Sequence, residues 1–289
     1  MTPTGVDSLR LAVLQTDAVL EDIEGNATAI AEAASGLSAD LVVTPELSLT
    51  GYSLGASAGA LARGLAVGSG IAGAEALGEV QGTIVVGLPE RSATGHPFNA
   101  AAAVRDGRVR HVHRKRYLPT YGMFEEARHF TPGQSLELHS VDDAWSVGLL
   151  ICEDLWHPAL AYLLAMAGAD IIAILAAAPG RGVWDGGDGS RFGSWEGWIR
   201  LARVTAQVHG TYVALANRGG VEGPVTFAGG SLIVAPDGAV VAQADASSGV
   251  VLEATLDRRA LDAARAAAPH RRDEDARWLA ERLRRLADG

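Results

Sequence analysis

The sequence predicts a single α/β domain in which mixed β-sheets are covered by helices on their outer faces. Three observations lead to this class. Short apolar runs alternate with amphipathic stretches through most of the 289 residues, as in β-α units. Hairpin signals lie among them, such as Asp106-Gly107, a pair that favours the positive φ of a tight turn. No Pro/Ser-rich linker divides the chain, so we expect one domain over residues 1–289, with 255–289 as a C-terminal helical tail.

The apolar runs predict about eleven short strands, each ended by a turn signal. In chain order they are Leu9–Gln15, Leu41–Thr44, Thr83–Gly87, Ala100–Val104, Val109–His113, Trp145–Ile151, Ile171–Leu175, Tyr212–Ala216, Ser231–Val234, Val240–Ala244 and Val250–Ala254. Because so many strands would strain one open sheet, two sheets fit this count better.

Four stretches have the periodicity of helices, and two glycine-rich stretches indicate loops. The helices are Asn26–Ser35, Pro158–Ala167, Ser194–His209 and the charged, amphipathic Asp273–Leu286, and the loops are Gly64–Gly78 and Pro179–Gly193. The second loop is long enough to be a lid or binding loop, with Arg181, Trp184, Asp185, Asp188 and Arg191 as its charged and aromatic residues. In the last helix, Trp278, Leu279 and Leu286 would pack either on a partner subunit or on the chain's own core.

Composition excludes several classes of protein. Lys and Arg number 24 and Asp and Glu number 34, and a net charge of −10 disfavours nucleic acid and membrane surfaces as partners. The apolar run Ala159–Ala178 contains Asp170, which would cost about 3 kcal/mol in mid-bilayer, so a buried helix and strand explain it better. Cys152 is the one cysteine and the N-terminus has no signal-peptide pattern, so we expect a cytoplasmic protein.

Three chemically reactive side chains stand at the ends of predicted strands. Cys152 and Glu46 each follow an apolar run, and Lys115 lies two residues beyond the predicted strand Val109–His113. The carboxyl ends of strands are where α/β folds place reactive groups. Each also has an ordinary explanation: a small buried thiol, a carboxylate that caps a turn, and a solvated lysine in a basic run. A helix N-terminus after Cys152 would lower the pKa of its thiol. Together the three describe a nucleophile, a base and a cation for an oxyanion, with no histidine required.

Three segments carry a resemblance to a known family. Thr44–Tyr52 (TPELSLTGY), His113–Pro119 (HRKRYLP) and Gly148–Trp156 (GLLICEDLW) resemble, in that order, the catalytic motifs of the nitrilase, or carbon–nitrogen hydrolase, superfamily. The similarity runs from Leu9 to about Ala254. It implies a four-layer α-β-β-α sandwich with two mixed sheets and a homodimer or larger homo-oligomer. We expect no metal and no other cofactor.

The resemblance also implies a role for each reactive residue. Cys152 would attack the carbonyl carbon of a small amide, while Glu46 would take the thiol proton, pass it to the leaving amine and then activate water. Lys115 and a backbone N–H just after Cys152 would hold the oxyanion. The family often has a second carboxylate near the lysine, for which Glu126 is the best match and Glu125 the competitor.

Six residues are candidates for substrate binding: Tyr52, Tyr121, Phe124, Glu153, Trp156 and Ala177. The aromatic residues could equally be core residues, and Trp156 matters most because it follows the nucleophile by four positions. Leu118–Glu126 and Cys152–Trp156 look most like the glutamine-hydrolysing domain of NAD synthetases. That domain typically has Asn-Ala-Ser-Pro where this sequence has Ala176–Pro179. With no ATP-pyrophosphatase motif in the sequence either, a free-standing amidase is expected rather than a complete synthetase.

Several alternatives stay open. Nitrile hydrolysis and N-carbamoyl-amide hydrolysis use the same three residues, and a catalytically silent scaffold would keep only the fold. A Cys–His hydrolase would need His157 as the partner of Cys152. A metal hydrolase would need a third ligand beside His111 and His113, two residues on one face of a strand.

Overall fold

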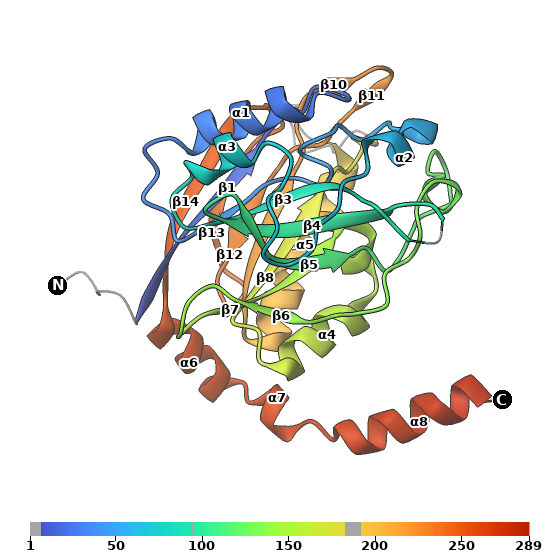
Figure 1. The fold of residues 1–289 in the computed structure, drawn as a ribbon. Coiled ribbons are helices and arrows are strands. Elements are labelled where there is room, and N and C mark those ends of the chain that lie inside the picture. The colour runs from blue at the N-terminus through green and yellow to red at the C-terminus, as the bar shows by residue number, and fades with distance from the viewer. Residues whose placement is uncertain (1–6, 94, 183–191, 289) are drawn as a thin grey trace.

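Two six-stranded sheets pack face to face, and helices cover both outer faces (Figure 1). The computed structural model describes residues 7–93, 95–182 and 192–288. Helices α1 (Ile23–Ala34) and α3 (Ala74–Gly78) cover the first sheet, while α4 (Pro158–Ala167) and α5 (Gly193–His209) cover the second. The predicted four-layer α-β-β-α sandwich with two mixed sheets is confirmed.

The first sheet has the order β14-β1-β2-β3-β4-β5. Its strands are β1 (Ser8–Gln15), β2 (Leu41–Val43), β3 (Thr83–Glu90), β4 (Phe98–Arg105), β5 (Arg108–Arg114) and β14 (Val250–Asp257). β1, β2 and β3 run parallel, and the outer strands are antiparallel to their neighbours. The predicted turn between β4 and β5 is confirmed, since Asp106 and Gly107 have φ +52° and +67°.

The second sheet has the order β13-β12-β9-β8-β7-β6. Its strands are β6 (Leu138–Ser140), β7 (Ser146–Ile151), β8 (Ile171–Ala176), β9 (Tyr212–Asn217), β12 (Leu232–Val234) and β13 (Val240–Gln243), and a separate ribbon pairs β10 (Val221–Glu222) with β11 (Val225–Thr226). β7, β8 and β9 run parallel. Their carboxyl ends therefore meet at one edge of the sheet.

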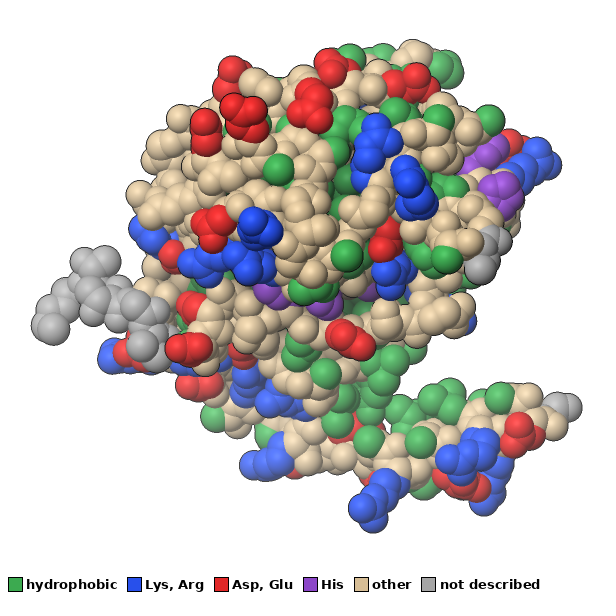
Figure 2. All heavy atoms as spheres, viewed as in Figure 1, with side chains coloured by type: hydrophobic (Ala, Val, Ile, Leu, Met, Phe, Trp, Pro, Cys, Tyr) green, Lys and Arg blue, Asp and Glu red, His purple; other side chains and the backbone are tan. Residues whose placement is uncertain are grey.

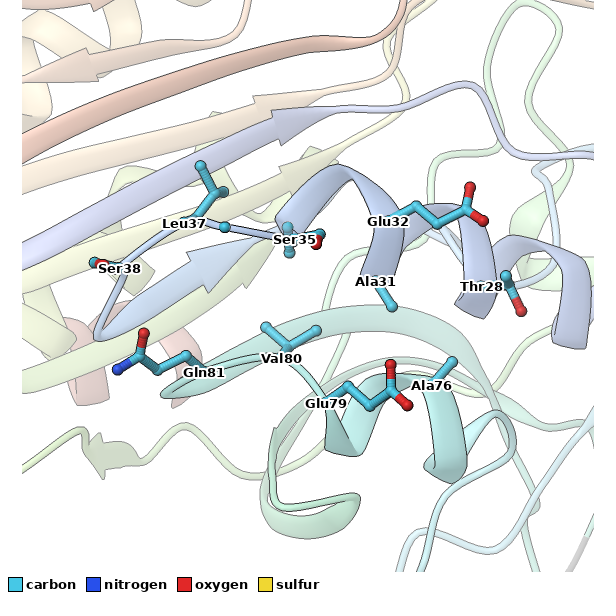
Figure 3. Close-up of a pocket in the computed structure, with 12 residues that line it drawn as sticks. Thr28, Ala31, Glu32, Ser35, Leu37, Ser38, Ala76, Glu79, Val80 and Gln81 are labelled. Atoms are coloured by element: carbon cyan, nitrogen blue, oxygen red, sulfur yellow. The ribbon is translucent and has the colours of Figure 1, made fainter.

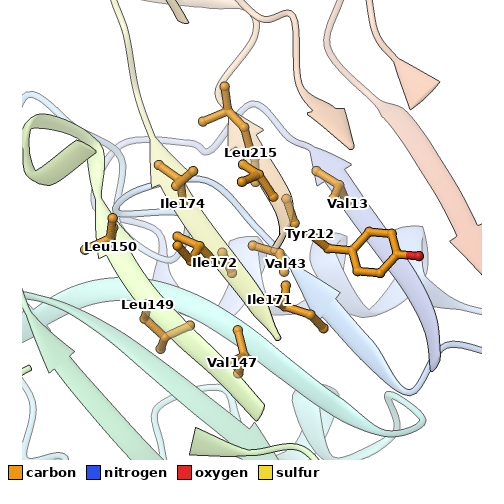
Figure 4. Packing of buried hydrophobic residues seen from close by; sticks show 14 of the residues in the cluster. Val13, Val43, Val147, Leu149, Leu150, Ile171, Ile172, Ile174, Tyr212 and Leu215 are labelled. Atoms are coloured by element: carbon orange, nitrogen blue, oxygen red, sulfur yellow. The ribbon is translucent and has the colours of Figure 1, made fainter. Parts of the chain in front are cut away.

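Successive side chains of each strand point to opposite faces of its sheet, and this divides the hydrophobic core into two parts. Val13 and Val43 of the first sheet pack in one cluster with Val147 and Leu149 of the second, and this cluster lies between the sheets (Figure 4). The alternate residues of β1 and β2 face α1 instead. Every residue of β8 is buried, which explains its continuous apolar sequence. The run Ala159–Ala178 is thus the helix and strand that its composition predicts, and in the described part of the chain no helix suffices to cross a bilayer.

The structure differs from the prediction mainly near the C-terminus and in the loops. β14 continues to Asp257, so residues 255–257 are strand, and three helices follow. They are α6 (Arg258–Ala267), α7 (His270–Asp273) and α8 (Ala276–Asp288). Two short helical segments, η1 (Gly55–Ser57) and α2 (Ala58–Leu61), precede the predicted loop Gly64–Gly78, which itself ends in α3. Trp184, Asp185, Asp188 and Arg191 of the second predicted loop lie outside the described residues.

Candidate active site

Cys152 lies at a sharp turn where β7 ends. The strand finishes at Ile151, and the chain continues directly into the short 3-10 helix η3 (Cys152–Trp156). Cys152 has φ +47°, a left-handed conformation that costs a non-glycine residue roughly 1–3 kcal/mol. Strain of this kind persists where the surrounding contacts enforce it, as they do at many functional sites. The cysteine is almost fully buried.

Glu46 lies beyond β2 and is also buried. Its Oε1 accepts hydrogen bonds from Lys115 Nζ at 2.7 Å and from Asn99 Nδ2 at 2.8 Å, and its Oε2 accepts one from the Ala177 backbone N–H at 3.2 Å. These donors offset the cost of burying a carboxylate. Gly87 permits the approach of this segment to β3, because a Cβ there would lie 2.3 Å from the backbone nitrogen after Glu46.

Lys115 is completely buried, one residue beyond the end of β5. Its Nζ lies 2.7 Å from Glu46 Oε1 and 2.7 Å from Glu126 Oε2. Burial by itself lowers the pKa of Lys115, but Glu126 and Glu46 outweigh that effect and raise the pKa well above its ordinary value. The lysine is therefore a permanent cation held between two carboxyl groups, and the alternative of a solvated lysine in a basic run is wrong.

Glu126, rather than Glu125, is the second carboxylate beside the lysine. Its Oε1 accepts hydrogen bonds from the hydroxyl of Tyr52 at 2.7 Å and from Lys115 Nζ at 2.8 Å. Burial, aided by the charge of Glu46, raises the pKa of Glu126 to about 7 despite the opposing effect of Lys115. Glu125 is exposed and pairs with Arg128 at 3.0 Å.

The raised pKa of Glu126 predicts a particular dependence of stability on pH. The folded protein keeps the Glu126 proton up to a pKa of about 7, compared with an ordinary value of 4.5, so folding takes up protons between these limits. The stability of the wild-type protein relative to Glu126→Gln should therefore fall as pH rises from 4.5 to 7. Chemical denaturation of both proteins across this range measures it, and a difference that stays constant or grows would contradict the prediction.

The thiol of Cys152 differs from the prediction in its acidity. Burial raises the pKa of this thiol well above its ordinary value, and the charge of Glu46 raises it further, while Lys115 and the Ala177 backbone N–H lower it. The expected lowering by a helix N-terminus is thus wrong, because burial and the carboxylates outweigh it. A thiol in this environment is protonated at neutral pH, so its use as a nucleophile requires a base.

Two of the predicted substrate-binding residues line a cavity of about 250 Å³ that reaches Glu126. Tyr52 and Phe124 lie in its wall. The ring of Tyr52 also packs edge-on against Phe227, with centroids 6.0 Å apart. Arg181 lies over the ring of Phe124, 5.2 Å from its centroid. The wall combines aromatic and aliphatic side chains, and Glu126 of the lysine site is one of its two carboxyl groups, beside Glu125.

Tyr121 and Glu153 lie together near this wall. The exposed Tyr121 donates its hydroxyl proton to Glu153 Oε2 at 2.8 Å, and its ring packs edge-on against Phe124 at 5.5 Å. Burial and the contact with Glu153 raise the pKa of Tyr121 to about 12. Both predicted residues therefore lie close to the cavity, and Glu153 directly follows the cysteine.

Trp156 is placed differently from the prediction. Its ring packs edge-on against Trp198 of α5, with centroids 5.6 Å apart, and it lies against Gly197. It is 45% exposed and is not among the described residues that line the cavity. The physical reason is that η3 turns its last residue towards α5. The structure therefore gives no support to Trp156 as a pocket residue.

The structure does not support the histidine alternatives. His157 stacks on Tyr117, with centroids 3.4 Å apart. His113 Nε2 lies 3.0 Å from Asp154 Oδ2, and His111 stacks on His139. Among the described residues, no group of three or more His, Cys, Asp or Glu side chains is arranged to hold a metal ion.

A second hollow lies apart from these residues. A groove of about 540 Å³ runs between α1 and α3 on the outer face of the first sheet (Figure 3). Its charged lining residues are Glu32 and Glu79, whose carboxylates attract cations and repel anions. No thiol or lysine is among its lining residues, so the cysteine site is the better candidate for chemistry.

Sequence reasoning missed two polar residues that hold the site together. Asn99 donates to Glu46, and Asp154 receives donors from the segments next to Cys152 and Lys115. The signal for Asn99 was a lone amide in the apolar strand β4, FNAAAAVR. Asp154 stands within the Cys152 motif, but its role cannot be read from the sequence because only the fold brings its partners together.

Comparisons with known proteins identify the family of the chain. Residues 10–266 match the carbon–nitrogen hydrolase family. The chain is 31% identical to a protein named "Hydrolase in pqqF 5'region" from Pseudomonas protegens, over 92% of this chain and 89% of that protein. It is also 31% identical to a glutamine-dependent NAD(+) synthetase from Thermotoga maritima, over 81% of this chain but only 39% of the synthetase. The crystal structure of a carbon–nitrogen hydrolase from Helicobacter pylori G27 superimposes with a TM-score of 0.78 at 23% identity, covering 96% of this chain and 99% of that one.

The chain therefore belongs to the carbon–nitrogen hydrolase family, and the predicted resemblance is confirmed. It is an enzyme of the carbon–nitrogen hydrolase class.

Proposed function

We propose that this enzyme is an amidase that releases ammonia from a small carboxamide through a thioester on Cys152. The observation that carries the proposal is the burial of Lys115 between Glu46 and Glu126, next to a buried thiol. A cation that is fixed and desolvated stabilises a developing oxyanion far better than one in water. A carboxylate beside a protonated thiol supplies the base that the thiol needs. We propose that residues 1–289 act as one catalytic domain.

The first half of the reaction forms the thioester. Glu46 takes the proton of the Cys152 thiol while sulfur bonds to the amide carbon, and the carbonyl oxygen becomes an oxyanion. Lys115 Nζ and the backbone N–H that follows Cys152 stabilise this charge. Collapse of the oxyanion breaks the C–N bond, and Glu46 gives its proton to the leaving nitrogen, which departs as ammonia.

The second half hydrolyses the thioester. Glu46 removes a proton from water, the resulting hydroxide equivalent attacks the thioester carbon, and the C–S bond breaks. The proton returns from Glu46 to sulfur, and a carboxylic acid leaves. Among the described residues Oε2 of Glu46 accepts one hydrogen bond, the 3.2 Å contact from Ala177, whereas Oε1 accepts two. Oε2 is therefore the oxygen that we assign to proton transfer.

Glu126 acts in this proposal as a fixed partner of Lys115 and the substrate amide. With a pKa near 7, it carries a proton in part of the population at neutral pH and can then donate to a substrate oxygen. Tyr52 fixes its orientation through the 2.7 Å hydrogen bond. Phe124, Tyr121 and Glu153 line the approach, so a small amide with a planar or polar tail fits better than a bulky one.

Nitrile and N-carbamoyl-amide hydrolysis remain alternatives for the same residues, whereas the scaffold role gains no support from an intact set of buried reactive groups. The test is a screen of small carboxamides, ureido acids and nitriles for ammonia release, together with iodoacetamide labelling. Because Cys152 is the one cysteine of the chain, any thiol adduct reports on it alone. Ammonia from carboxamides supports the proposal, whereas turnover only of nitriles or ureido acids would replace it with an alternative.

For partners and location we propose a homodimer or larger homo-oligomer in the cytoplasm, with no nucleic acid or membrane partner. An apolar groove of about 470 Å³ lies between α4, α5 and α8. Leu163, Val204 and Leu283 are more than half exposed along it. Figure 2 shows hydrophobic side chains along the side of α8 that faces the body of the molecule. We assign this surface to contact between subunits.

Substitution of one exposed valine tests this assignment. Val204→Asp should shift the assembly towards monomer, because a carboxylate cannot be buried cheaply in an apolar contact. Val67→Asp is the matched control, since Val67 is 71% exposed in the loop before α3. Light scattering after gel filtration measures the mass of each protein. A monomeric wild-type protein, or equal masses for both variants, would contradict the assignment.

A further inference from the structure

The carboxylate of Asp154 is fully buried in the turn that carries the nucleophile. Asp154 follows Cys152 by two residues within η3. Its Oδ2 accepts a hydrogen bond from the backbone N–H of Ile151 at 3.1 Å, so the carboxylate closes the turn around the cysteine. This bond holds the residue before Cys152 against the residue two positions after it. The left-handed φ of Cys152 is thereby enforced from both sides.

The same carboxylate binds the segment that carries the lysine. Asp154 Oδ1 accepts from the backbone N–H groups of Arg116 and Tyr117, each at 3.0 Å. Its Oδ2 lies 3.0 Å from Nε2 of the buried His113. These three contacts flank Lys115 in the sequence. His113 lies two positions before it, and Arg116 and Tyr117 directly follow it.

This arrangement links the two sheets at the point where catalysis is proposed. Lys115 follows β5 of the first sheet, and Cys152 follows β7 of the second. No strand pairing joins β5 to β7 in the described sheets, so hydrogen bonds within a sheet do not set their separation. The other backbone hydrogen bonds of Lys115 do not reach the cysteine segment. Its N–H donates to the carbonyl of Asn99, and its carbonyl accepts from the N–H of Gly133, both at 2.8 Å.

We propose that Asp154 is a positioning residue that sets the distance between the Lys115 ammonium and the Cys152 sulfur. The inference rests on the proposed function, because the distance matters only if Lys115 stabilises the oxyanion and the charge around the Cys152 thiol. Four donors converge on one carboxylate, which compensates the cost of burying it. The geometry that they fix is the geometry that the reaction needs.

Asp154→Asn is the sharpest variant, because it keeps the shape and removes half of the acceptors. An amide offers one acceptor oxygen, so its NH₂ group must face either the Arg116 and Tyr117 donors or those of Ile151 and His113. Either choice releases one of the two segments. We expect kcat to fall about 100-fold with KM nearly unchanged, since a displacement of about 1 Å has this effect on a positioned reaction.

Asp170→Asn is the matched control. Asp170 is also a buried carboxylate, bound by Arg258 and Arg265 and by the backbone N–H of Ser146, at the opposite end of β8 from Ala177. We expect this variant to be less stable but to keep the kcat of the wild-type protein. A loss of kcat equal to that of Asp154→Asn would overturn the proposal, because it would reveal a general effect of buried carboxylates.

A second measurement separates positioning from the proposed function itself. The rate of Cys152 alkylation by iodoacetamide needs no substrate, and it is compared in the wild-type protein, Asp154→Asn, Lys115→Met and the double variant. If Asp154 acts through the lysine, each single substitution slows alkylation, and Asp154→Asn adds little in the Lys115→Met background. The proposal would be overturned if the fold-reductions in alkylation rate of the two single variants multiplied in the double variant, or if Asp154→Asn left the rate unchanged. Both results can be obtained even if no amide is turned over.

His113 supplies a further pair of variants if Asp154→Asn does not fold. His113→Leu removes one donor to Asp154, whereas His113→Gln can keep a donor near the position of Nε2. We expect slower alkylation and lower kcat for the leucine variant, and recovery of most of both for the glutamine variant. Equal rates for the two variants would count against the proposed role of the Asp154 contacts.

Discussion

The Cys152→Ala protein is expected to release no ammonia above background from any amide that the wild-type protein hydrolyses. Without the sulfur no thioester can form, so both halves of the proposed reaction are lost. Removal of a nucleophile from a comparable catalytic set lowers kcat by about 10⁶-fold. A Cys152→Ser protein should be as inactive, because a buried hydroxyl is far less acidic than the thiol that it replaces.

The measurement is steady-state ammonia release, with circular dichroism as the control for folding. Since the chain contains one cysteine, the alanine variant should also lose all reaction with a thiol reagent. Wild-type turnover in this variant would remove Cys152 from the mechanism. Loss of turnover without any thiol reactivity in the wild-type protein would point to a structural role instead.

The Glu46→Gln protein should show the next largest effect, a fall in kcat of about 10⁴-fold. Loss of a general base costs up to about this factor, and Glu46 serves in both halves of the reaction. The substitution keeps the volume of the side chain but cannot take up the thiol proton. It also leaves Lys115 with Glu126 as its remaining charged partner among the described residues.

The matched control is Glu79→Gln, at the exposed end of α3 beside the outer groove. It should keep wild-type kcat and KM. For Glu46→Gln, iodoacetamide labelling of Cys152 should slow together with kcat, because the same proton must leave the thiol. If this variant were labelled at the wild-type rate but had lost turnover, Glu46 would act only in the steps after thioester formation. If it kept wild-type turnover, Glu46 would be excluded as the base.

Much of the fold could be predicted because its strands are buried. Ile171–Leu175 and Tyr212–Ala216 are continuous apolar runs between turn signals, and the helix Pro158–Ala167 begins at a proline and ends before a glycine, as the structure has it. The bounds of α6 within the predicted helical tail could not be read, because this helix buries only Leu261 among its residues. β6 was missed because its three residues, Leu138–Ser140, are partly exposed and show no apolar alternation.

The site was predictable to the extent that its residues stand at strand ends. Cys152, Glu46 and Lys115 each follow a predicted strand, and the structure brings them to one place. The contacts of Asn99 and Asp154 could not be read from the sequence. Asn99 reaches Glu46 only through the strand order of the first sheet, and Asp154 reaches the lysine segment only through the packing of the two sheets. The direction of Trp156 could not be read for a related reason, since this side chain at the end of η3 packs on Trp198 of α5.

Partitioning of the acyl group between water and hydroxylamine tests the central claim most directly. The best small amide and an ester of the same acid are hydrolysed in the presence of hydroxylamine, and acid and hydroxamate are measured. If both substrates pass through one thioester on Cys152, the ratio of hydroxamate to acid is the same for both, whatever group has left. A ratio that depends on the leaving group, or hydrolysis with no hydroxamate at any hydroxylamine concentration, would contradict the proposed intermediate.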